Sequence, residues 1–288
     1  MAKFEKKYST DLSDKEWYVL KQFWDKVELK RDPRGRSMEL ELREVMNAIR
    51  YVLRNGVSWR NLPKDYPKAA SVYYHFAKWR DEGLWRKMNK HLRRALRKKL
   101  GREEEPSEAS MDSQSIRGSL HEGNGYHGGK KVNGRGRHLL TDTLGLLLAV
   151  LVTPANLADV SVARRLCARY ALEATRLKAI WADQAYRSAS LTSWLMTSYS
   201  WLLTILTKGD VKGFKPIPKR WPVERTFSWL LNYRRLSRDY EVLPESSECW
   251  IYMAMSDLML KRLCGTSTPK FQPKRLPPKR VRLTSESA

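Results

Sequence analysis

Apolar side chains recur at helical spacing through about the first hundred residues of the chain. Ser13 and Glu16 have the spacing of a capping box, which opens a helix. A second run of apolar residues on one helical face stops at Asn55-Gly56, a pair typical of a helix C-terminus. This pattern predicts later helices at about 42–53, 69–80 and 84–100, with a short helical turn at 58–63.

The short turn followed by a basic, aromatic helix resembles a helix-turn-helix, in which the second helix enters the major groove of DNA. In that interpretation Lys78 and Arg80 contact DNA. A plain helical bundle that uses Tyr73, Tyr74 and Trp79 as core explains the same pattern equally well.

The periodicity changes after residues 101–110, a segment with a glycine, a proline and an acidic run. We therefore predict a helical domain at 1–105, which is the candidate DNA-binding domain, and a second domain at 106–264. Residues 265–288 are rich in proline and basic residues, which predicts a disordered tail. The tail either adds nonspecific phosphate contacts or is inert.

The second half of the chain has the pattern of strands alternating with helices. Strands are predicted at 109–113, 138–143, 146–152, 177–183 and 201–206, and helices at 159–171, 188–196 and from Pro222 onward. This order predicts an α/β (α+β) fold, a mixed sheet flanked by helices. The glycine-rich stretch 118–138 is predicted to be a mobile loop that contacts a phosphate backbone through Lys130, Lys131, Arg135 and Arg137.

The chain is strongly basic, with 55 Lys and Arg against 31 Asp and Glu and a formal net charge of +24. The surplus positive charges repel one another in the folded protein, which favours a polyanionic partner. Nucleic acid is the leading candidate.

Three cysteines (Cys167, Cys249 and Cys264) form no CxxC pair, which argues against a disulfide framework and against a structural zinc site. No signal-peptide stretch and no run of about 18 apolar residues occurs. We therefore expect a soluble cytoplasmic protein without a membrane partner.

Three carboxylates are the candidate catalytic groups. Asp112 and Asp183 each end an apolar run, and Glu224 lies in the first turn of a predicted helix. Each position is ordinary by itself, since strands often end in acids and helix N-termini favour them. If the first and fourth predicted strands lie side by side, however, the three carboxylates converge, which is costly unless cations compensate them. Mg²⁺ prefers such ligands, and two ions can support phosphoryl transfer without a protein nucleophile.

A zinc hydrolase is the alternative metal chemistry. His121, His127 and His138 lie in or beside the glycine-rich stretch, but their spacing matches no usual zinc ligand set.

Four segments resemble the DDE transposases of bacterial insertion sequences, specifically the insertion sequence five family. They are MDSQSIR (111–117), GKKVNGRGRHLLTDTLGLLLAVLVTPANLAD (129–159), IWADQAYR (180–187) and RWPVERTFSWLLNYRRLSRDYE (220–241). The helical N-terminal part, from LSDKEW through GVSWRNLP to YYHFAKWRDEGLW, also resembles the DNA-binding region of that family.

The resemblance implies a ribonuclease-H-like catalytic core with Asp112, Asp183 and Glu224 as the DDE triad. It implies a metal-dependent polynucleotidyl transferase and endonuclease that uses two Mg²⁺ ions, with Mn²⁺ as a substitute. The enzyme would hydrolyse DNA at the ends of the element, and the freed 3′-hydroxyls would attack target DNA. The implied partners are double-stranded terminal inverted repeats, target DNA, and further copies of the chain in a dimer or larger complex, within the bacterial nucleoid.

Arginines around Glu224 are the candidate phosphate clamps: Arg220, Arg225, Arg234 and Arg235. The chain departs from the broader group at Ile217 and Leu231, where that group has a tyrosine and a basic residue. Arg235 shares a helical face with Glu224 if the helix continues, and would then replace the missing basic group. Two other functions stay open: a nuclease on the same fold, which cuts without joining, and a DNA-binding repressor or domesticated transposase without catalysis.

Overall fold

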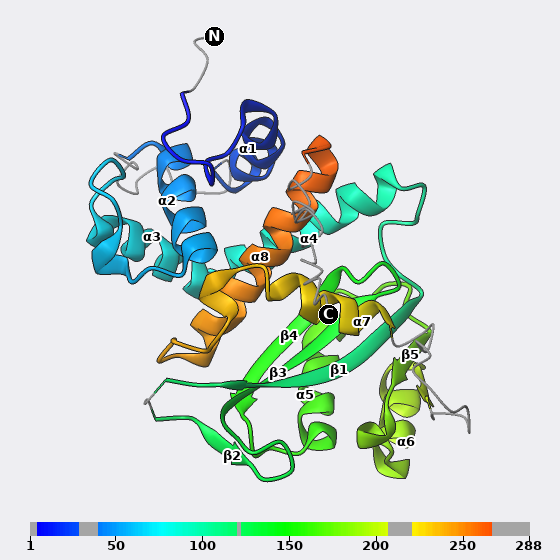
Figure 1. The fold of residues 1–288 in the computed structure, drawn as a ribbon. Helices are drawn as coiled ribbons and strands as arrows, with labels where there is room; N and C mark the ends of the chain where they lie inside the picture. Colours follow the sequence, from blue (N-terminus) through cyan, green and yellow to red (C-terminus); the bar gives the residue numbers. More distant parts are fainter. Residues whose placement is uncertain (1–4, 29–39, 120–121, 207–220, 267–288) are drawn as a thin grey trace, which may run out of the picture.

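The computed structural model describes residues 5–28, 40–119, 122–206 and 221–266 (Figure 1). Its first part is helical, as predicted. The elements are α1 (Asp14–Glu28), α2 (Leu42–Asn55), the 3-10 turn η1 (Trp59–Asn61), α3 (Ala69–Asp81) and α4 (Leu84–Lys99). None of the helices in the described ranges is both long and apolar enough to cross a membrane. Residues 267–288 of the predicted tail, His121, Ile217 and Arg220 lie outside the described residues.

The predicted helix ends are confirmed in detail. The amide of Ser13 donates to Glu16 Oε2 at 2.8 Å, and the amide of Glu16 donates to Ser13 Oγ at 3.2 Å, which makes the capping box that opens α1. Gly56 ends α2 with a φ of 71°, and its amide donates to the carbonyl of Val52 at 2.9 Å.

The second part contains a mixed sheet whose strands, apart from a short added one, follow the predicted order. The strands are β1 (Glu108–Arg117), β2 (Gly125–His127), β3 (Val132–Asp142), β4 (Leu147–Pro154), β5 (Ala179–Ala182) and β6 (Leu202–Ile205). β1 pairs antiparallel with β3 and parallel with β5, β6 lies beyond β5, and β4 and β2 both pair with β3. The remaining elements are α5 (Asp159–Ala171), η2 (Gln184–Tyr186), α6 (Ala189–Tyr199), α7 (Trp221–Leu230), η3 (Arg234–Leu236) and α8 (Pro244–Cys264).

Alternation of side chains along the strands divides the sheet into two faces. Met111 and Ala182 belong to an apolar cluster with side chains of α5 and α6. Leu139 and Val150 belong to a second cluster, which contains side chains of α7, α8 and the N-terminal helices. Helices therefore cover both faces of the sheet, as predicted.

The second apolar cluster crosses the predicted domain boundary at residue 105. It joins side chains of α1 to α4 with those of β3, β4, α7 and α8. α8 packs against α1, α3 and α4 as well as against β4. The N-terminal helices and the sheet thus share a continuous core.

The glycine-rich stretch 118–138 is not a single loop, and this part of the prediction is wrong. Residues 125–127 form β2 and residues 132 onward form β3. A Cβ atom on Gly134 would lie 2.0 Å from the carbonyl oxygen of Ile116, so glycine is required here by the close approach of β3 to β1. The glycines gave a loop-like pattern because they carry no side chains to reveal the strand alternation.

Candidate active site

Asp112 and Asp183 are brought together by the register of two parallel strands. The pairing of β1 with β5 ends at Met111 and Ala182, and the two aspartates are the next residues on these strands. Because Met111 and Ala182 face α5 and α6, the residues that follow them turn toward the opposite face, which α7 and α8 cover. Both aspartates are half-buried.

Each aspartate is also held by a backbone amide. Asp112 Oδ1 accepts a hydrogen bond from the amide of Ser113 at 2.7 Å. Asp183 caps η2, where its Oδ1 accepts from the amide of Ala185 at 2.9 Å. These bonds fix the direction of each carboxylate.

Tyr186 is a buried residue within reach of the charges of both aspartates, and the sequence pattern did not single it out. Burial, followed by the negative charges of Asp159, Asp112 and Asp183, raises the pKa of the Tyr186 phenol well above its ordinary value. The ring is 1% exposed and belongs to the α5 and α6 side of the core. Its place three residues after Asp183 is the signal in the sequence that could have identified it.

Glu224 lies in the first turn of α7, which packs on β1 and β3. The helix is docked on the turn between β3 and β4: Thr226 Oγ1 donates to the carbonyl of Gly145 at 2.7 Å, and Arg225 donates to the carbonyl of Leu144 at 2.9 Å. Glu224 itself is half-buried. The three predicted acids therefore come from β1, the end of β5, and the helix that covers the same face of the sheet.

The donor set is of the type that Mg²⁺ prefers, since it consists of carboxylate oxygens on adjacent elements. In the described ranges, no group of three or more His, Cys, Asp or Glu side chains is already placed around one potential ion position. The two aspartates are thus aligned by the sheet, and Glu224 lies on a separate helix, α7.

His138 does not support the zinc alternative, because its side chain is buried and both ring nitrogens lie near other side chains of the protein. Its Nε2 lies 3.0 Å from Thr153 Oγ1, and its Nδ1 lies 3.4 Å from Asp159 Oδ1. Burial lowers the pKa of His138 to about 4, and the charge of Asp159 only partly opposes this effect. The imidazole is therefore neutral at pH 7.

Arg135 and Arg137 are buried, which corrects the prediction that they contact phosphate. Both residues are 1% exposed in β3. Arg135 donates to the carbonyl of Val242 at 2.6 Å, and Arg137 donates to the carbonyl of Leu236 at 2.8 Å. Burial lowers the pKa of Arg137 to about 10, although Asp239 opposes the shift. These guanidiniums tie β3 to the segment between α7 and α8.

Arg235 does not lie on the helical face of Glu224, so its predicted role as a replacement basic group is also corrected. α7 ends at Leu230, and Arg235 belongs to η3. Its Nη2 lies 2.5 Å from Glu241 Oε1, and its Nη1 donates to the carbonyl of Val57 at 3.2 Å.

Other predicted DNA contacts lie on the surface or near it. Lys130, Lys131 and Arg234 are exposed, whereas Arg225 is half-buried and stacks 4.9 Å from the ring centre of Trp229. Lys78 keeps a partly exposed side chain beside Glu82. Arg80 is 14% exposed and held by Asp81 at 2.9 Å and by Ser246 at 3.0 Å.

α3 combines the two interpretations of its aromatic residues. Phe76 and Trp79 are buried in the core, as in a helical bundle. Tyr73 and Tyr74 are 44% and 60% exposed, so they remain accessible to a partner.

Two family models match the chain over successive segments. Residues 12–89 match the model described as "Putative transposase of IS4/5 family". Residues 103–256, more than half of the chain, match the model described as "Transposase DDE domain". A comparison with curated proteins found no match.

Proposed function

Because the chain belongs to the DDE transposases of the IS4/5 family, we propose that it cuts DNA at the ends of an insertion sequence and joins the 3′-hydroxyl ends to target DNA. Its mixed sheet flanked by helices is of the ribonuclease-H-like type, preceded by a helical region. The observation that carries the proposal is the alignment of Asp112 and Asp183 on adjacent parallel strands, with α7 covering the same face.

In this proposal Asp112, Asp183 and Glu224 are the metal ligands. When bound, two Mg²⁺ ions, or Mn²⁺ in their place, would supply Lewis-acid activation of the attacking oxygen and stabilisation of the leaving oxygen. The sheet fixes the two aspartates, and α7 holds Glu224 over the same face of the sheet. The carboxylates repel one another until a cation is present, so metal binding and approach of Glu224 are expected to be coupled.

Double-stranded DNA is the proposed substrate and partner, both as terminal inverted repeats and as target. The exposed side chains of Lys130, Lys131 and Arg234 are the candidate phosphate contacts in the described part of the chain. The helices up to residue 105 are proposed to bind the element ends, with Tyr73 and Tyr74 on their accessible surface. Joining requires two ends to be held together, so we expect a dimer or larger assembly on DNA, in the bacterial nucleoid.

The test is a strand-transfer reaction with pre-cut element ends, supercoiled target DNA and Mg²⁺. We expect joined products from the wild type and none from Glu224→Gln, Asp112→Asn or Asp183→Asn, with all four proteins binding the ends equally in Ca²⁺. The control is Glu245→Gln, which neutralises an exposed acid in the first turn of α8 and should leave joining unchanged.

Each alternative function has its own outcome in this assay. Metal-dependent cutting of uncut ends without any joining by wild type indicates a nuclease on the same fold. Binding of the ends without cutting or joining, in a reaction where assembly is confirmed, indicates a repressor or domesticated transposase.

A further inference from the structure

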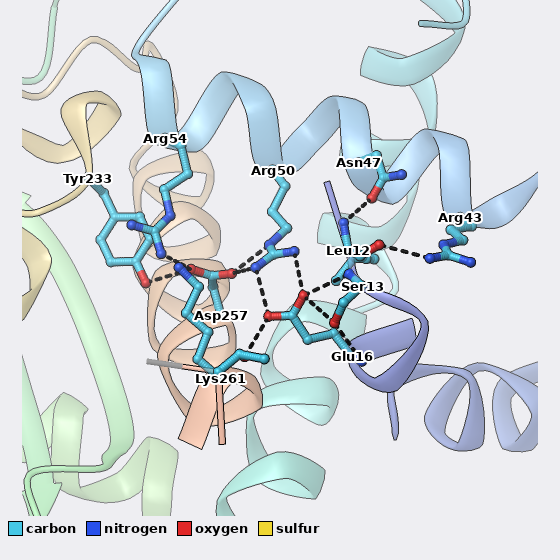
Figure 2. Close-up of polar contacts among 11 residues, drawn as sticks. Leu12, Ser13, Glu16, Arg43, Asn47, Arg50, Arg54, Tyr233, Asp257 and Lys261 are labelled. Carbon is cyan, nitrogen blue, oxygen red and sulfur yellow. Dashed lines mark hydrogen bonds and ion pairs between the residues drawn. The ribbon is translucent and has the colours of Figure 1, made fainter. Parts of the chain in front are cut away.

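A buried cluster of charges surrounds Asp257, in the middle of α8 (Figure 2). Asp257 is 2% exposed. Its Oδ1 accepts from Arg50 of α2 at 2.5 Å, and its Oδ2 accepts from Arg54 of α2 at 2.5 Å. The hydroxyl of Tyr233 donates to the same Oδ2 at 2.9 Å, and Lys261 Nζ lies 3.7 Å away. One carboxylate thus joins α2, α8 and the segment that follows α7.

The cluster continues into α1 through Glu16. Arg50 Nη2 lies 3.4 Å from Glu16 Oε1, and Ser13 holds the other oxygen of this carboxylate through its amide at 2.8 Å (Figure 2).

Burial by itself would raise the pKa of Asp257, but the charges of Arg50, Arg54 and Lys261 outweigh it and hold the pKa well below its ordinary value. Asp257 is therefore ionised at neutral pH.

Tyr233 connects this cluster to the helix of Glu224. Its amide donates to the carbonyl of Leu230, the last residue of α7, at 3.1 Å. The guanidinium of Arg54 lies 4.4 Å from the centre of the Tyr233 ring. A second contact acts one turn earlier, where Arg262 of α8 lies 4.2 Å from the ring centre of Trp229. The C-terminal end of α7 is thus held by α2 and α8.

We propose that Tyr233 and Asp257 are positioning residues for the phosphoryl-transfer reaction, which hold the C-terminal end of α7 and so fix the place of Glu224 over the sheet face of Asp112 and Asp183. This inference rests on the proposed function. It makes the N-terminal helices part of the support of the catalytic helix, because Arg50 and Arg54 belong to α2 and Glu16 to α1.

The physical reason lies in the directionality of the contacts. Apolar packing tolerates small rotations of a helix, whereas charge-assisted hydrogen bonds act only over a narrow range of distances and angles. A buried ion-pair network gains little stability over apolar side chains of the same volume, so specificity of geometry is the better explanation of its presence. A displacement of a catalytic group by about 1 Å can cost up to about 100-fold in rate.

The protein contains a matched control for the Tyr233 contact. Tyr170 of α5 is also buried, and its hydroxyl donates to Glu105 Oε2 at 3.2 Å. Glu105 in turn pairs with Arg93 at 3.0 Å and with Arg94 at 2.6 Å. Tyr170 thus donates to a carboxylate held by two arginines, as Tyr233 does, but it lies on the α5 side of the sheet.

The experiment compares Tyr233→Phe with Tyr170→Phe in the full chain. Four quantities are measured: the thermal midpoint, the Kd for an element-end duplex in Ca²⁺, Mn²⁺ binding by electron paramagnetic resonance, and the single-turnover cleavage rate over a series of Mg²⁺ concentrations. We expect similar small decreases in thermal midpoint and an unchanged DNA Kd for both variants. Only Tyr233→Phe should bind Mn²⁺ several-fold more weakly, need more Mg²⁺, and cleave about 10-fold or more slowly at saturating DNA.

Equal Mn²⁺ binding and equal cleavage by Tyr233→Phe and the wild type would overturn the inference, as would equal losses in both variants. If Tyr233→Phe does not fold, Arg54→Lys replaces it, with Arg93→Lys as its control, because each arginine faces the corresponding tyrosine ring. A wild type that cleaves no element end refutes the proposed function alone, since the Mn²⁺ comparison still tests the support of the site.

Discussion

Replacing Arg135 by methionine distinguishes a structural role of this side chain from a contact with DNA. The guanidinium is 2% exposed and donates to the carbonyl of Val242 at 2.6 Å. It also lies 3.6 Å from Asp239 Oδ1, whose carboxylate is 1% exposed. Methionine has a similar length without charge or donors, so Asp239 loses its nearest cation while it keeps a hydrogen bond from Ser247 at 2.7 Å.

The expected loss of stability follows from this burial. Removing one partner of a buried ion pair costs about 3–5 kcal/mol, because the other charge stays buried and uncompensated. Since Asp239 keeps its bond from Ser247, we expect the Arg135→Met variant to be near the lower end, at about 3 kcal/mol. For a chain of this size that corresponds to a decrease of roughly 6–12 °C in the thermal midpoint.

The assay combines urea unfolding with DNA binding over a series of salt concentrations. Each lost phosphate contact lowers the slope of log K against log salt by about 0.9, whereas loss of a buried side chain leaves this slope unchanged. We expect Arg135→Met to lose stability and keep the slope. Lys130→Ala is the comparison, because Lys130 is exposed and should show a reduced slope with unchanged stability. An Arg135→Met protein with wild-type stability and a reduced slope would refute the structural role.

Three further changes test the support of the fold. Gly145 has a φ of 76°, and a Cβ atom there would lie 2.9 Å from the carbonyl oxygen of Pro222, so Gly145→Ala should cost at least about 1–2 kcal/mol in urea unfolding; an unchanged midpoint would contradict this. His138 has a pKa of about 4 in the folded protein against about 6.5 for an ordinary histidine, so the unfolded chain binds more protons between these values, and stability should fall by ~3 kcal/mol as pH decreases from about 7 to about 4. His138→Gln should flatten that pH profile, and an unaltered profile would count against the neutral imidazole. Ser13→Ala removes the hydroxyl that accepts from the Glu16 amide and should cost about 1 kcal/mol in urea unfolding; wild-type stability would show that this cap does not stabilise α1.

Local signals were sufficient for most elements of the chain. The helix predicted at 159–171 coincides with α5, and the capping box at Ser13 and the glycine at position 56 lie at the ends that were predicted. Such signals depend on residues within a few positions of one another, so they can be read without tertiary contacts.

α8 was missed for a physical reason. It is buried on nearly all sides, so it lacks the alternation of apolar and polar faces that marks a surface helix. Pro244 at its start and Gly265 at its end were the available signals. The role of a polar residue such as Asp257 became clear only from its partners, which lie in α2 and in the segment after α7.

The class of fold, the three candidate acids and the basic character that favours DNA could all be predicted from the amino-acid sequence. Which charges face solvent was decided only by the tertiary structure: Arg137 and Lys131 are six residues apart, yet one is buried in β3 and the other is exposed. The same holds for the adjacency of Asp112 and Asp183, which comes from strand register over a long sequence separation. Burial and register depend on contacts between distant segments, and a linear pattern of residue types does not contain those contacts.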